Sequence, residues 1–295
     1  MEMTYELGLI GWPLGHSLSP VLHQTALIET GLKGEYCLYP VPPLPEGQAT
    51  LLEIMEKIRV GALQGVNVTI PHKQSVIPHL DFLTDTALSI GAVNVIFAQD
   101  GKLAGDNTDA PGFMADLTKN LRMGLPRNVL VLGAGGSARA VIYSLLQSGC
   151  QVWCASRRLE QAGELKNDLR INDMTGEVHP IVLNSSSILP ILGDCDLIVN
   201  TTSVGMFPHI ENTPWPEGLD FPPKAFIYDL VYNPVETRLV SQARNAGLVA
   251  VTGLGMLVEQ AALAFERWTE QPAPREAMRQ AVMNFGLAGQ TGKGK

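Results

Sequence analysis

Short apolar runs separated by longer amphipathic stretches fill the second part of the chain and predict a parallel sheet covered by helices. A buried parallel strand is apolar along its whole length because helices cover both faces of such a sheet. The expected strands are 129–132, 151–155, 179–183, 196–200, 226–230 and 248–251. Six strands in alternation with helices are typical of a doubly wound, Rossmann-type dinucleotide fold.

The first part of the chain predicts a separate α/β region. Apolar or loosely alternating runs indicate strands at 7–10, 36–41, 62–70 and 91–97, and helical patterns cover 48–59 and most of 81–89. Asp100-Gly101 is a hairpin turn signal. The return strand ends in a polar cluster, 105–112, and a helix over about 111–120 leads to the second domain. A long helix to about residue 268 and a last helix follow the second part.

A glycine-rich turn joins the strand at 129–132 to the helical pattern that follows it. The spacing is G-x-G-x-x-A, with Gly133, Gly135 and Ala138. The first glycine permits the tight turn, the second lets a pyrophosphate approach the backbone, and the alanine keeps the helix close to the sheet. A strand before this motif and a helix after it are the context that supports dinucleotide binding. The alternative is a tight turn without a ligand.

The end of the next strand indicates which dinucleotide is bound. An NAD site places an acidic residue there to hold the ribose 2′-hydroxyl. This chain has Ser156-Arg157-Arg158 instead. Guanidinium groups suit a 2′-phosphate. The alternative is that both arginines are ordinary solvated surface residues. The sequence favours the first interpretation, and therefore NADP.

Polar residues gather near the predicted strand ends of the first part. Ser17 and Ser19 lie two apart, so in an extended segment their hydroxyls point the same way; the alternative for Ser19 is a helix N-cap. Lys73 is expected at a helix start, where the helix dipole disfavours its positive charge. We therefore infer that Lys73 has a functional role; the alternative is an exposed surface lysine. Taken singly, Asn94 and Asp109 would be turn or capping residues. The whole set suits a small polyhydroxylated acid and proton transfer at a carbonyl or alcohol: Ser17, Ser19, Asn67, Thr69, Lys73, Asn94 and Asp109.

Composition excludes several classes of function. The chain has 295 residues, 45% of them hydrophobic, and a net charge of −8, which disfavours nucleic acid and anionic membranes as partners. The N-terminus lacks a basic start followed by an apolar core, and the longest apolar run, 248–258, is too short to span a bilayer. We therefore expect a cytoplasmic protein. Its four cysteines are scattered and are interpreted as buried reduced thiols, and its six histidines as loop or surface residues without metal-ligand spacing.

Eight motifs in order resemble the shikimate dehydrogenase family nearly from end to end. They are GHSLSP, GVNVTIPHK, GAVNV, GDNTDAPGF, VLGAGGSARA, NTTSVGM, YDLVYNP and GLGMLVEQA. The resemblance implies two α/β domains with a cleft between them. Residues 1–109 with 254–295 would form the substrate domain, and residues 110–253 would form the Rossmann-type NADP domain.

The resemblance also implies roles for single residues. Lys73 and Asp109 match the family's catalytic pair. Ser17 and Ser19 would bind the substrate carboxylate, and the other substrate contacts would be Asn67, Thr69, Asn94, Tyr232 and Gln260. The cofactor contacts would be Gly133, Ala134, Gly135, Gly136, Ser137, Ser156, Arg157, Arg158, Leu230 and Gly253. The family usually has a hydroxyl residue where this chain has Arg158, so the detail of the phosphate contacts departs from the family pattern.

The implied reaction is the reversible, NADPH-dependent reduction of 3-dehydroshikimate to shikimate in the biosynthesis of chorismate and aromatic amino acids. The residues leave open whether Lys73 transfers the proton or only stabilises charge. The alternatives are a quinate or shikimate dehydrogenase that uses NAD, a methylene-tetrahydrofolate dehydrogenase, and a protein that binds NADP or shikimate without turnover. The absent acid after the second strand argues against the first, and intact Lys73 and Asp109 argue against the last. The candidate assembly is a homodimer.

Overall fold

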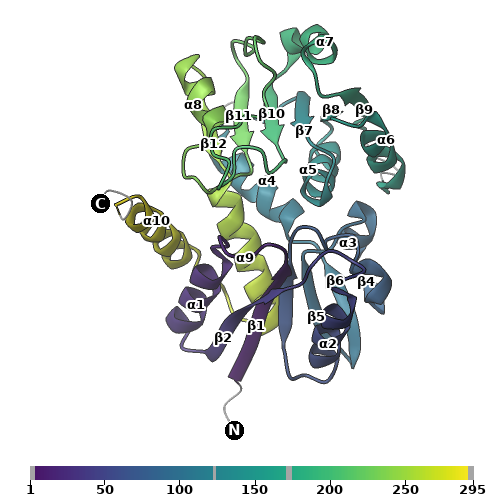
Figure 1. The fold of residues 1–295 in the computed structure, drawn as a ribbon, viewed down its shortest axis with the longest axis vertical. Helices are drawn as coiled ribbons and strands as arrows, with labels where there is room; N and C mark the ends of the chain where they lie inside the picture. Colours follow the sequence, from purple (N-terminus) through teal and green to yellow (C-terminus); the bar gives the residue numbers. More distant parts are fainter. Residues whose placement is uncertain (1–3, 122–123, 171–174, 292–295) are drawn as a thin grey trace. The chain divides into compact units, whose positions relative to one another are not determined.

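The protein consists of two compact units, each with its own six-stranded sheet (Figure 1). The computed structural model describes residues 4–121, 124–170 and 175–291. The first unit comprises Met1–Gly112 and Val258–Lys295, and the second comprises Phe113–Leu257. Two helices, α4 (Asp109–Asn120) and α9 (Leu254–Thr269), begin in one unit and end in the other.

The sheet of the first unit is mixed, with strand order β2-β1-β3-β5-β6-β4. Strands β1, β2 and β3 are parallel to one another, whereas β5 is antiparallel to both β3 and β6. The six strands are β1 (Thr4–Gly11), β2 (Lys33–Pro40), β3 (Gly65–Val68), β4 (Phe82–Leu83), β5 (Val95–Gln99) and β6 (Lys102–Asp106).

Amphipathic helices supply the core of the first unit. Helix α2 (Gln48–Arg59) occupies the predicted span, and its apolar residues recur at helical spacing in the core cluster: Leu51, Ile54, Met55 and Ile58. The other helices are α1 (Ser19–Glu29), α3 (Asp85–Ile90), α10 (Arg275–Thr291), which packs against α1, and the short 3-10 helix η1 (Ile77–His79).

Local turn chemistry accounts for one hairpin, and a short strand departs from the prediction. Asp100 and Gly101 both have positive φ, 52° and 72°, as a type I′ turn requires, and they join antiparallel β5 and β6 as predicted. The prediction of a mostly helical segment over 81–89 is wrong at its start. Phe82 and Leu83 form β4 beside β6, because pairing with a neighbouring strand outweighs local propensity.

The sheet of the second unit is entirely parallel, with strand order β12-β11-β10-β7-β8-β9. This is the doubly wound dinucleotide-binding order, with β7 and β10 as neighbours where the winding direction reverses. The strands are β7 (Asn128–Leu132), β8 (Gln151–Ser156), β9 (Val178–Val182), β10 (Leu197–Asn200), β11 (Phe226–Asp229) and β12 (Ala250–Thr252). The Rossmann-type fold predicted from the sequence is confirmed.

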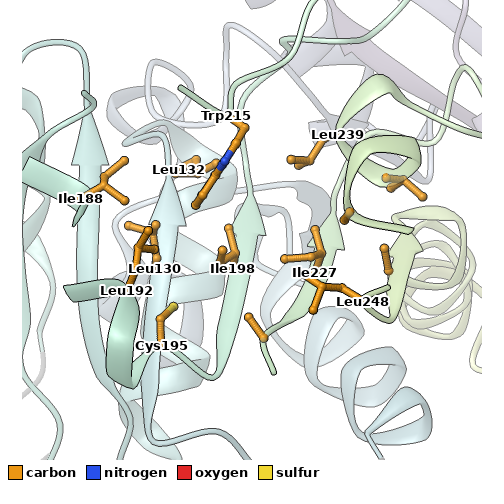
Figure 2. Packing of buried hydrophobic residues seen from close by; sticks show 14 of the residues in the cluster. Leu130, Leu132, Ile188, Leu192, Cys195, Ile198, Trp215, Ile227, Leu239 and Leu248 are labelled. Carbon is orange, nitrogen blue, oxygen red and sulfur yellow. The ribbon is translucent and has the colours of Figure 1, made fainter. Parts of the chain in front are cut away.

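Helices cover both faces of this sheet. On one face, Figure 2 shows Leu130, Ile198 and Ile227 in one cluster with Leu239. The next residue along β11, Tyr228, points to the opposite face and contacts the Phe113 ring of α4 edge to face, with 5.2 Å between the ring centroids. The remaining elements are α5 (Gly136–Gln147), α6 (Leu159–Asp168), α7 (Ser185–Ile188), η2 (Leu189–Asp194) and α8 (Arg238–Asn245). Within the described residues, no helix has the length and hydropathy to cross a membrane.

Candidate active site

The loop after β1 places the Ser17 hydroxyl beside the backbone N–H of Ser19 at the start of α1. The backbone N–H of Ser19 donates a hydrogen bond to Ser17 Oγ at 3.2 Å. The segment does not meet the condition of an extended conformation, because Leu18 has helical φ and ψ and is itself the N-cap residue. Ser19 is the first helical residue, so the alternative role of an N-cap is wrong. Its hydroxyl has no hydrogen-bond partner among the residues that the structure describes.

The chain leaves β3 through Thr69 and then forms turns that carry Lys73. Thr69 lies against the loop after β1, since its N–H donates to the Ile10 carbonyl at 2.9 Å. The expectation that Lys73 starts a helix is wrong. Residues 70–76 form consecutive turns, and only the short η1 follows them. No long helix therefore opposes the charge of Lys73 at this position.

Lys73, Asp109 and Asn94 form a hydrogen-bonded cluster with almost no access to solvent. Lys73 Nζ donates to Asp109 Oδ2 at 2.5 Å, and their side chains are 12% and 6% exposed. Asn94 Nδ2 donates to the other carboxylate oxygen, Oδ1, at 2.9 Å. Asp109 is also the first residue of α4, where the helix dipole stabilises a negative charge. The cluster therefore holds a cation at a fixed place beside a carboxylate.

Three further side chains extend this cluster within the first unit. Gln260 Oε1 accepts a long hydrogen bond from Asn94 Nδ2 at 3.4 Å. Thr108 holds the same amide, since its N–H donates to Asn94 Oδ1 at 2.7 Å. Asn67 Nδ2 donates to the Asn94 backbone carbonyl at 3.2 Å. The structure therefore brings together four predicted polar residues, Asn67, Asn94, Asp109 and Gln260, with Lys73 beside them.

The glycine turn of the second unit has the shape that a pyrophosphate requires. Gly133 has a φ of 109°, and a Cβ there would come within 2.7 Å of Thr201 Oγ1. A Cβ at Gly135 would instead meet no atom within 4 Å, so open space lies where a phosphate would approach. Gly135 is the N-cap of α5, and no side chain caps the first turn of this helix. These features fit a dinucleotide pyrophosphate at the N-terminus of α5.

The end of β8 presents arginines and no acidic side chain. Ser156 is buried, and its hydroxyl donates to Gln161 Oε1 at 3.4 Å. Arg157 and Arg158 are both exposed, and neither forms an ion pair with any residue that the structure describes. The two guanidinium groups are therefore available to an anionic ligand. They lie close to the glycine turn along the sheet, because β8 pairs with β7, the strand that precedes this turn.

The ends of β11 and β12 are in close backbone contact. A Cβ at Gly253 would lie 2.1 Å from the Leu230 carbonyl oxygen, so only glycine fits there. Asp229 holds the loop that begins at Leu230, since Oδ1 accepts from the Val231 N–H at 3.0 Å. Burial raises the pKa of Asp229 to about 6. Tyr232 follows in the same loop of the second unit, and burial raises its pKa.

The histidines and cysteines differ in part from their interpretation. His23 is completely buried within helix α1, which corrects the expectation that all six histidines are loop or surface residues, whereas His72 lies in a loop as expected, although it too is completely buried. His23 lies on the inner face of α1, and His72 bonds the Val41 carbonyl at 2.7 Å. The four cysteines are free, but Cys37 is only half-buried. Within the described part of the chain, no group of three or more acidic, cysteine or histidine side chains has an arrangement that would hold a metal ion.

Comparison with known proteins identifies the family. Residues 9–96 match the model of the shikimate dehydrogenase substrate binding domain, and residues 253–283 match that of the shikimate 5'-dehydrogenase C-terminal domain. The shikimate dehydrogenase (NADP(+)) of Shouchella clausii (strain KSM-K16) is 40% identical over 283 residues, which cover 95% of this chain and 98% of the relative. The chain belongs to the shikimate dehydrogenase family.

Solved structures agree with membership of the shikimate dehydrogenase family. The shikimate 5-dehydrogenase of Thermus thermophilus, in complex with NADP(H) and shikimate, superposes with a TM-score of 0.80 at 36% identity, over 95% of this chain and 99% of that one. The quinate dehydrogenase of Corynebacterium glutamicum, in complex with NAD, superposes with a TM-score of 0.82 at 28% identity, over 96% of this chain and 100% of that one.

Some residues that shape the site in this shikimate dehydrogenase family member were not found from the sequence. Tyr36, which bonds Asn67, and His23, which stacks on Tyr36, were both missed. The spacing of buried residues along α1, at 19, 22, 23, 26 and 27, places His23 on the inner face and was the available signal. No local pattern marks Tyr36, because its partner lies 31 residues away.

Proposed function

We propose that this protein catalyses the reversible, NADPH-dependent reduction of 3-dehydroshikimate to shikimate. The observation that carries the proposal is the buried pair of Lys73 and Asp109, with Asn94 bonded to the same carboxylate. A fixed ammonium beside a carboxylate suits the reduction of a carbonyl, in which negative charge develops on oxygen. The similarity to shikimate dehydrogenase (NADP(+)) over 95% of the chain supports the choice of substrate and cofactor.

Polar residues of the first unit would hold the substrate. The hydroxyls of Ser17 and Ser19 suit its carboxylate, because they are donors at the start of a helix, where the dipole also favours an anion. The remaining contacts suit its hydroxyl groups, because amide and hydroxyl side chains offer both donors and acceptors. They are Asn67, Thr69, Asn94 and Gln260, with Tyr232 from the second unit.

Lys73 and Asp109 would act at the oxygen of the substrate that changes from carbonyl to hydroxyl. When NADPH is bound, it supplies the hydride. The Lys73 ammonium would donate a hydrogen bond to the carbonyl oxygen and stabilise the negative charge that forms there. Asp109 keeps the ammonium in place and would accept a hydrogen bond from the product hydroxyl. One proton must reach the new alkoxide, and Lys73 is the donor beside it.

The second unit would bind the cofactor. The open space at Gly135 and the uncapped N-terminus of α5 suit the pyrophosphate, with Ala134, Gly136 and Ser137 alongside. Arg157 and Arg158, after Ser156, suit the 2′-phosphate that distinguishes NADP from NAD. The contact between Leu230 and Gly253 would form part of the nicotinamide pocket. The residue ranges for the substrate and cofactor domains, a cytoplasmic location and a homodimer stay predictions.

Steady-state turnover with two substrates and two cofactors tests the proposal. The purified protein is assayed with shikimate or quinate, each with NADP⁺ or NAD⁺, by the absorbance of the reduced nicotinamide. We expect fast turnover only with shikimate and NADP⁺. Turnover with quinate and NAD⁺ at a similar rate would favour the relationship to quinate dehydrogenase. Absence of turnover in protein that binds NADP⁺ would contradict an enzymatic role.

Variants of Arg157 and Arg158 test the preference for NADP independently of the proposed substrate and reaction. Replacement of Arg157 and Arg158 by glutamine should raise KM for NADP⁺ at least tenfold and leave KM for NAD⁺ nearly unchanged, because only NADP⁺ carries the 2′-phosphate. Arg238→Gln, on α8, is a matched loss of a surface guanidinium. Equal losses for both cofactors would show that the arginines do not read the phosphate.

A further inference from the structure

Tyr36 is an inward-facing tyrosine on β2, the edge strand of the first unit's sheet. It is the only buried residue of this strand, at 7% exposure. Its hydroxyl donates a hydrogen bond to Asn67 Oδ1 at 2.8 Å. Asn67 lies on β3, two strands away, with β1 between them. The tyrosine therefore reaches across the neighbouring strand to hold one amide.

His23 holds the ring of Tyr36 in place. The two rings stack with 4.3 Å between centroids and only 4° between planes. Burial lowers the pKa of His23 to about 3, against the opposing effect of the neighbouring Asn67 side chain, so the stacked imidazole is neutral. The Trp268 ring also contacts His23, at a tilt, with 5.3 Å between the ring centroids. Neither ring nitrogen of His23 has a hydrogen-bond partner among the described residues. His23 therefore holds the Tyr36 ring by packing.

The hydrogen bonds of Asn67 define the orientation of its amide. Oδ1 accepts from Tyr36, and Nδ2 donates to the Asn94 backbone carbonyl at 3.2 Å. Rotating the amide by half a turn would place Oδ1 against that carbonyl oxygen, and two acceptors repel. A primary amide has two N–H donors, and the bond to Asn94 uses one of them. The observed orientation therefore leaves a second N–H of Asn67 to donate to a ligand oxygen.

We propose that Tyr36 is a positioning residue for the substrate: its hydroxyl, held by the stack on His23, fixes the Asn67 amide so that Nδ2 presents an N–H donor to a substrate hydroxyl. This inference rests on the proposed function, in which Asn67 contacts the substrate. Tyr36 itself touches no reacting atom in this scheme. Its contribution is to binding, since the substrate hydroxyl bonds the same donor before and during the reaction.

Tyr36→Phe removes only the hydroxyl and keeps the ring on His23. KM for shikimate should rise about three- to tenfold, the effect of one lost hydrogen bond, while kcat and KM for NADP⁺ change less than twofold. Tyr39→Phe is the matched control, because Tyr39 lies on the same strand and its hydroxyl bonds no described residue. An unchanged KM for shikimate in Tyr36→Phe would overturn the proposal.

A double-mutant cycle tests whether Tyr36 acts through Asn67. In an Asn67→Ala background, Tyr36→Phe should have no further effect on KM for shikimate. Equal effects in both backgrounds would overturn the positioning role. His23→Ala, which removes the stacked ring, should resemble Tyr36→Phe in its KM for shikimate. Wild-type protein that fails to oxidise shikimate would refute the proposed function itself, whereas an additive cycle in active protein would refute only this inference.

Discussion

Asp109 uses both of its carboxylate oxygens to fix donors, Lys73 at one and Asn94 at the other. A carboxylate held in this way cannot rotate without losing one of two charge-assisted hydrogen bonds, which are the strong kind. The two donors come from different turns of the first unit, one after β3 and one before β5. At the scale of single residues, the site is therefore rigid where charge must be placed and depends on three side chains acting together.

Loss of the Lys73 ammonium should affect the transition state more than substrate binding. We expect Lys73→Ala to lower kcat for shikimate oxidation by about 100- to 1000-fold, the usual cost of removing one donor to a developing oxyanion, and to raise KM far less. Steady-state kinetics separate the two. Lys57→Ala removes an exposed lysine paired with Glu53 and serves as control. A variant that loses only affinity would contradict this role.

The two glycines of the turn have different roles: Gly133 is required by the backbone conformation, and Gly135 leaves space for the cofactor. Gly135→Ala should leave the melting temperature unchanged, because its φ is −88° and no atom lies within 4 Å of the new methyl. It should weaken NADP⁺ binding at least tenfold, because the methyl occupies the space of the pyrophosphate. Gly133→Ala should lower the melting temperature, since φ is 109° there. Titration calorimetry and thermal unfolding measure both, and a destabilised but tightly binding Gly135→Ala would refute the assignment.

Candidate site residues that stand in short motifs could be located from the sequence, whereas tertiary contacts could not. The turn of Gly133 and Gly135 and the arginines after β8 are examples of such motifs, and their roles toward the cofactor stay predictions. The bond between Asn94 and Gln260 joins residues 166 positions apart, and only the resemblance to a family suggested that Gln260 belonged to the site. Lys73 was expected at a helix start because no sequence signal distinguishes consecutive turns from the first turn of a helix.

At the scale of elements, a buried acid ties together the ends of β10, β11 and α8. Asp229 accepts from Asn200 Nδ2 at 2.8 Å and from Thr237 Oγ1 at 2.6 Å. Thr237 is also the N-cap of α8, and Asn200 Oδ1 bonds the N–H and hydroxyl of Thr202 in the next loop. One carboxylate therefore organises both loops, 201–206 and 230–234, at the carboxyl ends of the strands, where ligands bind in such sheets.

The raised pKa of Asp229 makes stability depend on pH. Its pKa rises from 3.8 to about 6 on folding, mainly through burial, so the folded protein binds this proton more tightly than the unfolded chain. Stability from this group is therefore gained as pH falls through 6 and is complete below 3.8. Relative to Asp229→Asn, the wild-type free energy of unfolding should increase by about 1 kcal/mol from about pH 7 to about pH 5. Denaturant titrations measure the difference, and parallel pH curves for the two proteins would contradict the assignment.

The elements themselves were predictable to different degrees. The six strands of the second unit lie within two residues of their expected positions at every end, because buried parallel strands are continuous apolar runs. Strand β4 was missed, since two residues carry no periodicity and only β6 makes them a strand. The inner face of α1 was not recognised from the sequence. Two of its buried residues are polar, a serine and a histidine, and they interrupt the apolar pattern that would otherwise indicate a buried helix face.

At the scale of the whole molecule, each unit has its own sheet and its own buried cluster. Such units can respond separately to ligands, because local opening is governed by local contacts. The proposed division of roles then has a direct consequence: each ligand should protect the backbone of one unit first.

Hydrogen exchange detected by mass spectrometry tests this division. NADP⁺ alone should slow exchange in 133–138 and 201–206, and shikimate alone should slow it in 14–20 and 67–73. The expected protection follows from the ligand-dependent stabilisation of the state that binds. The peptide over 48–59, a helix remote from the motifs, is the internal control. Protection of the glycine turn by shikimate alone, or of the paired serines by NADP⁺ alone, would contradict the assignment of the units.

The first unit is assembled from two pieces of chain that are made at different times. Its strands lie before residue 113, but Gln260 and Trp268 belong to the segment that follows residue 257. Trp268 fills the space directly over Gly65 of β3, where a Cβ would lie 2.1 Å from the indole nitrogen. On the ribosome, the whole second unit is synthesised before this tryptophan is added. Folding during synthesis should therefore reach completion first in the middle of the chain, and the substrate-binding half must wait for the last helices to arrive.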